Sequence, residues 1–115
     1  MSNFSINVEH LERSISKVEV NGYLDAHTFD EFESTLIDLF DEGQYKIIVD
    51  MKNVPYISSA GAGVFIWAHG QANNNGGDIV ILNPSANVAE VLELLGLDQV
   101  FKIVPKLEMG LKVFM

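Results

Sequence analysis

The segment Ser58-Ser59-Ala60-Gly61-Ala62-Gly63 contains the residue types that could do chemistry in this sequence. A serine hydroxyl beside small residues can act as a nucleophile, accept a phosphoryl group or help to bind a phosphate. The two glycines begin a G-x-G-x-x-G pattern, but Ile66 occupies the position where a dinucleotide site has glycine. The P-loop pattern is absent, and Ile57 stands where the G-x-S-x-G nucleophile elbow has its first glycine. The sequence therefore indicates neither a nucleotide-phosphate loop nor an esterase elbow.

A serine nucleophile also needs a general base within hydrogen-bond reach. His69 follows Ser59 by ten residues on the same predicted helix, which places it roughly 15 Å away. His27 is not excluded by distance, so a serine hydrolase stays open as a less favoured alternative, as does a small-ligand-binding domain. We predict that the chain is not an enzyme and that it holds no cofactor or metal.

The same segment can also be interpreted as the beginning of a helix. Ser58 or Ser59 would cap that helix, which stabilises it by about 1 kcal/mol, and the glycines would allow close helix–sheet packing. A functional interpretation adds that a helix N-terminus stabilises a phosphate. Ala60, Gly61 and Ala62 would leave the backbone bare, so another protein could approach closely, and a phosphate there would weaken the contact.

Composition limits the classes of partner. The 115 residues are 48% hydrophobic and 20% charged, which is typical of one globular domain over residues 1–115. A net charge of −9 argues against nucleic acid and membrane surfaces as partners, and the absence of cysteine excludes disulfides and thiolate sites. Residues 1–7 lack the signature of a signal peptide, so we expect a cytoplasmic protein. The segment from Asp25 to Glu42 contains seven acidic residues and no lysine or arginine. These acidic residues form either a solvated face or a patch that steers a basic partner.

The elements that must position this segment follow from hydrophobic periodicity. Thr28 and Glu31 have capping-box spacing, with Asp25 as an alternative cap, and Gly43 and Gly96 are predicted helix stops. The order ββαβαβαβα predicts an α/β fold with a mixed sheet of four to five strands and about four helices. The predicted strands cover residues 4–8, 14–20, 46–51, 79–82 and 100–104, and the predicted helices cover residues 27–40, 58 to about 73, 83–95 and the residues after 105.

In the segment Ser58–Gly63 and at further positions along the chain, the sequence resembles the single-domain bacterial anti-sigma factor antagonists, which are STAS domains. The family's central motif is Asp-Ser-[Ser/Thr]-Gly-x-Gly, and its first serine is the phosphoacceptor. In this sequence that serine is Ser59, Ser58 replaces the family's Asp, and Ala60 replaces the following hydroxyl. The resemblance covers essentially the whole chain, and it is carried by Gly22–Asp25, Asp50, Tyr56–Val64, Leu95–Leu97 and Phe101.

The resemblance implies a STAS-like fold and a partner-switching mechanism. The unphosphorylated protein would bind an anti-sigma factor that is itself an ATP-dependent serine kinase, so that a sigma factor is freed. Phosphorylation would end binding, and a serine phosphatase would reset the switch. The chain would be the substrate in this cycle and would contribute no catalytic group.

The resemblance also implies the site residues. Ser59 is the expected phosphoacceptor, with Ser58 as the alternative. Asp25 and Asp50 match acidic positions near the acceptor, although Asp50 could simply cap the end of a strand. An alternative within the same family is a scaffold that binds partners in another pathway without being phosphorylated. The expected partner-binding residues are Asp25, Ser58, Ala60, Gly61, Ala62 and Gly63.

Overall fold

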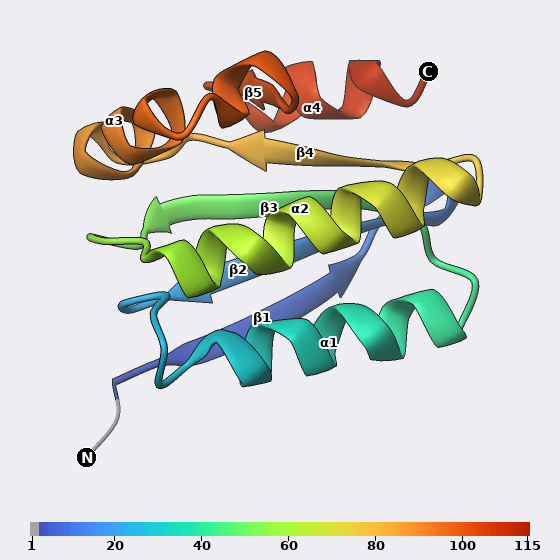
Figure 1. The fold of residues 1–115 in the computed structure, drawn as a ribbon. Coiled ribbons are helices and arrows are strands. Elements are labelled where there is room, and N and C mark those ends of the chain that lie inside the picture. The colour runs from blue at the N-terminus through green and yellow to red at the C-terminus, as the bar shows by residue number, and fades with distance from the viewer. Residues whose placement is uncertain (1–2) are drawn as a thin grey trace.

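A five-stranded sheet forms the centre of the computed structural model, which describes residues 3–115 (Figure 1). The spatial order of the strands is β1-β2-β3-β4-β5, the same as their order in the chain. The first pair is antiparallel and the other three pairs are parallel, so the predicted mixed sheet is confirmed. The strands are β1 (Ser5–His10), β2 (Ile15–Asn21), β3 (Lys46–Asn53), β4 (Asp78–Leu82) and β5 (Lys102–Val104).

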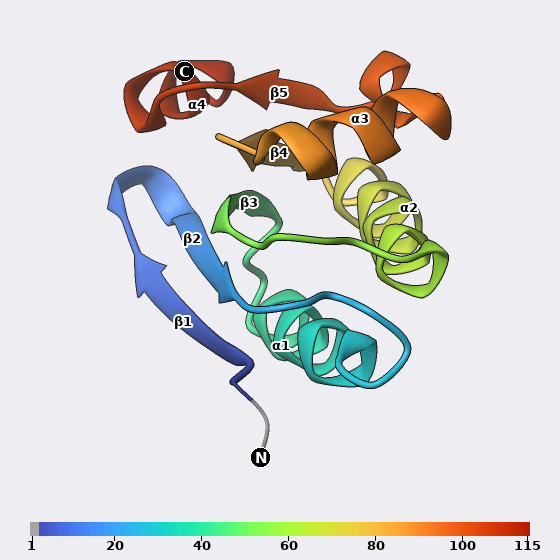
Figure 2. The same ribbon diagram turned by 90° about the vertical axis from the view of Figure 1, so that its left-hand side faces the viewer.

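Helices cover the two faces of the sheet unequally. Figure 2 shows α1, α2 and α3 on one face and α4 on the other. No helix within residues 3–115 has the length and apolar character needed to cross a lipid bilayer. The predicted element order is confirmed, with α1 (Phe29–Asp41), α2 (Ser59–Asn74), α3 (Ala86–Leu94) and α4 (Leu107–Val113), and with two short 3-10 turns at Glu12–Ser14 and Leu97–Gln99.

The apolar run of β3 has both faces buried, as predicted. Ile47, Val49 and Met51 belong to the larger core beneath α1, α2 and α3. Ile48 faces the opposite way, into a smaller core that α4 closes with Leu107 and Leu111. Alternation along a strand produces this division, because successive side chains point to opposite faces of a sheet. One strand therefore fixes the position of helices on both faces.

The part of the second face that α4 leaves uncovered carries polar side chains. Lys17 Nζ and Lys52 Nζ lie 3.8 and 3.6 Å from Oδ2 of Asp50, whose side chain is buried. Glu19 accepts hydrogen bonds from Asn7 and from a second asparagine on its own strand, and chiefly the Asn7 bond lowers the pKa of Glu19 below its ordinary value. Hydrogen bonds and ion pairs satisfy these groups where no helix covers the sheet.

The structure confirms the two glycines that were predicted to end helices, but it does not contain the predicted capping box at the start of α1. Gly43 and Gly96, with φ of +78° and +74°, directly follow the C-cap residues of α1 and α3, as expected for helix stops. Thr28 precedes α1, but its hydroxyl caps no helix N–H and instead donates to the Tyr23 carbonyl at 2.7 Å. The predicted capping box with Glu31 is therefore wrong, because a hydrogen bond to the loop before the helix takes the Thr28 hydroxyl.

Candidate functional site

Ser58 is the residue that caps α2. The Gly61 N–H donates to Ser58 Oγ at 3.4 Å, and the Ala62 N–H donates to the Ser58 carbonyl at 2.9 Å. Its backbone is extended, with φ −93° and ψ 174°, as is typical of an N-cap. The sequence left open which serine has this role. Since aspartate and serine are comparable N-caps, Ser58 can replace the family's Asp without loss of the cap.

Ser59 is the first residue of α2, and its side chain is exposed. Within residues 3–115 no hydrogen bond engages its hydroxyl, which is therefore free and open to solvent. The N–H groups of Ser59 and Ala60 lie in the first turn, where a helix supplies no carbonyl partner and its dipole is positive. A negative group on Ser59 would meet a favourable local field.

The first turn of α2 packs tightly against the chain that follows β2. Leu24 and Ile57 form a parallel bridge, in which the Leu24 N–H donates to the Tyr56 carbonyl at 3.1 Å and the Ser58 N–H donates to the Leu24 carbonyl at 2.9 Å. A Cβ on Gly61 would lie 2.8 Å from the Leu24 carbonyl oxygen, too close for any side chain. Glycine is therefore required at position 61.

This packing corrects part of the predicted partner surface. Gly61 and Ala62 are buried, so the expectation that their backbone is bare toward a partner is wrong. Ala60 is half-buried. Gly63 is exposed, and a Cβ there would meet nothing within 4 Å. Gly61 and Gly63 look alike in the motif but lie on different sides of the helix, because two residues correspond to more than half a turn.

Asp25 lies one residue beyond the Leu24 bridge, so it is near the start of α2 as expected. Its side chain is half-buried, and Oδ1 accepts the His27 N–H at 2.9 Å. The Thr28 hydroxyl accepts the Asp25 N–H at 3.0 Å, which closes the loop on itself. The carboxylate thus orders the turn before α1, and the Thr28 hydroxyl ties the Tyr23 carbonyl to that turn.

The acidic position at Asp50 lies elsewhere. Because Asp50 alternates with Val49 and Met51 along β3, its carboxylate points to the face of α4, away from α2. Its partners are Lys17 and Lys52. The expectation that Asp50 is near the acceptor is therefore wrong for its side chain. Its Oδ1 accepts the Lys52 N–H at 3.1 Å near the end of β3, so the alternative, in which Asp50 caps the end of a strand, agrees with the structure.

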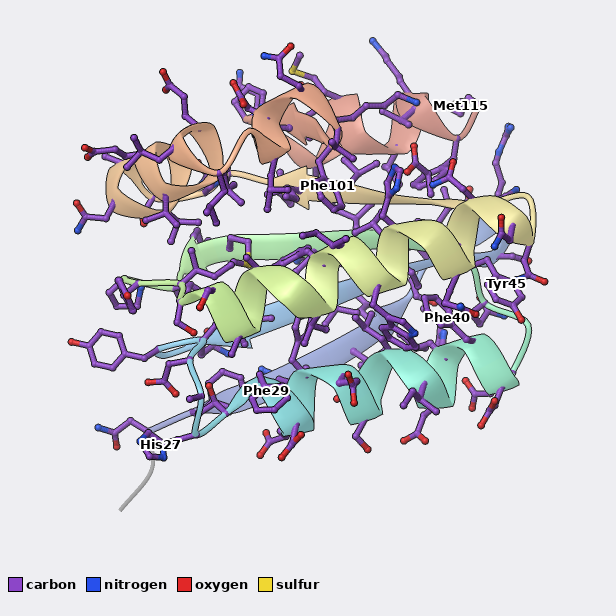
Figure 3. The ribbon with its side chains drawn as sticks, in the orientation of Figure 1. His27, Phe29, Phe40, Tyr45, Phe101 and Met115 are labelled. Atoms are coloured by element: carbon purple, nitrogen blue, oxygen red, sulfur yellow. The ribbon has the colours of Figure 1, made fainter. Side chains whose placement is uncertain are left out.

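Neither histidine considered as a base is hydrogen-bonded to Ser59 in the described part of the chain. His27 is exposed near the start of α1 (Figure 3). His69 lies in the C-terminal half of α2, where its ring packs edge-on against Phe101 at 5.0 Å and its Nε2 lies 3.9 Å from Asp78 Oδ1. A serine–base pair is not formed.

Tyr23 and Tyr56, which flank the Leu24–Ile57 bridge, belong to an exposed surface that the sequence analysis did not predict. Their side chains are 60% and 49% exposed, and Leu94 at the end of α3 is 79% exposed. These three residues, which we call the aromatic patch, line a groove of about 470 Å³ together with Pro55, Asn87, Glu90 and Val91. The available signal was weak, because the three residues come from three separate segments that only the fold brings together.

Serine-to-alanine variants should separate the roles of the two serines. Ser58→Ala removes the cap and should lower the free energy of unfolding by about 1 kcal/mol. Ser59→Ala removes an unbonded exposed hydroxyl and should change it by less than about 0.5 kcal/mol. Urea denaturation measures both, and an equal loss in the two variants would contradict the assignment of the cap.

Glycine-to-alanine variants test the two glycines in the same way. Gly61→Ala forces a Cβ against Leu24 and should lower the free energy of unfolding by about 1–3 kcal/mol. A Cβ at position 63 would have nothing within 4 Å, and alanine favours a helix more than glycine does. Gly63→Ala should therefore raise the free energy of unfolding by up to about 1 kcal/mol. Thermal unfolding followed by circular dichroism distinguishes the two signs, and a tolerated Gly61→Ala would refute the close contact.

Known proteins share this fold and sequence pattern. The model of the STAS domain family matches residues 5–109. An anti-sigma-B factor antagonist of Staphylococcus epidermidis is 28% identical over 100 residues, which are 86% of this chain and 93% of the relative. One from Staphylococcus aureus is 31% identical over 87 residues, which are 76% of this chain and 81% of the relative.

Solved structures agree in fold. The anti-sigma factor antagonist SpoIIAA in its unphosphorylated form has a TM-score of 0.83 at 20% identity, with 96% of each chain covered. The Bacillus cell fate determinant SpoIIAA in its phosphorylated form has a TM-score of 0.76 at 19% identity, with 96% of this chain and 100% of that chain covered. By fold and by sequence, the chain belongs to the STAS domain family.

Proposed function

We propose that this chain is an anti-sigma factor antagonist and that phosphorylation of Ser59 switches its binding off. The Staphylococcus relatives are named anti-sigma-B factor antagonists. The observation that carries the proposal is the Ser59 hydroxyl, exposed and unbonded within residues 3–115, at the positive end of a 16-residue helix. The chain acts as one domain over residues 1–115, in the cytoplasm, where sigma factors work.

In the unphosphorylated state the chain binds an anti-sigma factor, and the sigma factor held by that protein is released. The aromatic patch supplies the apolar anchor for this contact, because exposed tyrosine side chains bury a large area at low cost in conformational entropy. Gly63 and the half-buried Ala60 present little side chain beside Ser59, so the partner can approach the helix start closely. Asp25 contributes by ordering the turn before α1, to which the Thr28 hydroxyl ties the Tyr23 carbonyl.

Phosphorylation changes the charge at the start of α2. The anti-sigma factor acts as a serine kinase: Ser59 Oγ attacks the γ-phosphorus of ATP, ADP leaves, and the hydroxyl proton passes to a base of the kinase. The phosphate adds about −1.5 to −2 charge at pH 7. The start of α2 stabilises that charge in the free protein, whereas burial in an interface would desolvate it. The modified chain therefore remains folded and dissociates.

A serine phosphatase restores the switch by hydrolysing the phosphate ester, which releases inorganic phosphate and the free hydroxyl. This chain supplies no catalytic group to either reaction, so it is a substrate and not an enzyme. Its net charge of −9 disfavours nucleic acid as a direct partner. That SpoIIAA has been solved in unphosphorylated and phosphorylated forms supports the proposal that the shared fold tolerates the modification.

Ser59 is the better acceptor of the two serines on geometric grounds. Ser58 is half-buried and its hydroxyl accepts a helix N–H, so a kinase would have to break the cap to reach it. Ser59 needs no rearrangement. Replacing the family's Asp by Ser58 removes one negative charge beside the acceptor, which eases the addition of a phosphate there.

Incubation with the cognate anti-sigma factor and ATP should add one phosphate, measured by intact-mass spectrometry. Ser59→Ala should remain unmodified, and Ser58→Ala should still be modified. In calorimetric titrations Ser59→Ala should bind the anti-sigma factor like the unmodified protein, and Ser59→Glu should bind at least about 10-fold more weakly. Full phosphorylation of Ser59→Ala would contradict the assignment of Ser59 as the phosphoacceptor. If the original chain is not phosphorylated at all, a scaffold role would be favoured.

The aromatic patch should contain binding hot spots. Tyr56→Ala and Leu94→Ala should each weaken binding of the anti-sigma factor by about 10-fold or more, with little change in stability because both side chains are largely exposed. Met109→Ala is the matched control, since Met109 is 43% exposed but lies on α4, on the opposite face of the sheet. Equal binding by all three variants would contradict this docking surface.

A further inference from the structure

A groove of about 480 Å³ lies on the sheet face opposite α2, between the β1–β2 turn and α4. Figure 2 shows the turn and α4 on the same side of the sheet. Leu11, Ile15, Leu107, Leu111 and Met115 line the groove with apolar atoms, and Ile15 at 2% exposure forms part of the smaller core. The volume and the apolar lining are those of a small-molecule site.

The turn places one cation at this apolar groove. Arg13 is the only arginine of the chain, it lines the groove, and its side chain is exposed. Within residues 3–115, no carboxylate lies within 4.0 Å of its guanidinium and no side chain hydrogen-bonds to it. Glu12 also lines the groove, and it is the one acidic residue that does so. In a chain of net charge −9, an unpaired guanidinium beside an apolar groove is a specific local complement for an anion.

The backbone holds this guanidinium at a cost in conformational strain. Arg13 and Ser14 have φ of +62° and +60°, two consecutive residues in the left-handed region that glycine adopts freely and side-chain-bearing residues rarely do. A turn with glycine at position 13 would avoid that strain but would lose the charge. Strain of this kind is found where a side chain is held for binding.

We propose that the groove binds a small amphiphilic carboxylate such as a medium-chain fatty acid. The aliphatic chain lies against Leu11, Ile15 and Leu111, and the carboxylate accepts two hydrogen bonds from the Arg13 guanidinium. Glu12 opposes the ligand's charge and limits the affinity. The site shares no residue with the aromatic patch or with the start of α2, so it is independent of the proposed antagonist function.

Decanoate and decanol are the probes, because they share a tail and differ in the head group. Decanoate should cause saturable shifts in the amide resonances of residues 11–15 and 107–113 in two-dimensional NMR spectra, and decanol should bind about 10-fold or more weakly. Absence of saturable shifts with decanoate, shifts centred on other residues, or equal affinity for decanol would each overturn the proposal.

Two variants that should change the affinity for decanoate in opposite directions complete the test. Arg13→Gly should weaken decanoate binding by about 10-fold or more while raising the unfolding temperature, because it relieves the positive φ. Glu12→Gln should tighten decanoate binding, and Lys112→Ala, which removes a charge from α4 outside the groove, should leave it unchanged. An Arg13→Gly protein that is folded and binds decanoate with the original affinity would refute the role of the guanidinium.

Discussion

The contact between the first turn of α2 and the backbone of Leu24 is the constraint on which the rest of the site depends. Three features meet there: the Leu24 N–H bonded to Tyr56, the Leu24 carbonyl bonded to the Ser58 N–H, and a glycine at position 61 where any Cβ would collide. Together they fix the residue at which α2 begins. The beginning of the helix then decides which serine is the cap and which hydroxyl faces solvent.

Much of the architecture could be predicted from the sequence because hydrophobic periodicity reports burial directly. The alternation in β1 and β2 and the apolar runs of β3 and β4 produced the element order, and Gly43 and Gly96 marked helix ends. The position of Ser59 at a helix start was also predictable, since small residues and a hydroxyl precede a buried apolar stretch. These features are local, so a single sequence contains them.

What could not be predicted depends on contacts that lie outside any single helix or strand. The Thr28 hydroxyl turns to the Tyr23 carbonyl, which capping rules within one helix do not describe. Alternation places Asp50 opposite Val49 but does not say which face α2 covers. Gly61 and Gly63 differ only because Leu24 packs against one of them. The residues of the aromatic patch are far apart in sequence, and no local pattern connects them.

The agreement between strand order and chain order has a consequence for biosynthesis. Each strand pairs with its immediate predecessor, so a chain emerging from the ribosome can extend the sheet one edge at a time without waiting for a distant partner. An intermediate that ends at β3 already holds the antiparallel pair and the first parallel pair. Assembly in chain order leaves two open edges at each stage of translation, the outer edge of β1 and the newest strand, and only the second of these changes as the chain grows.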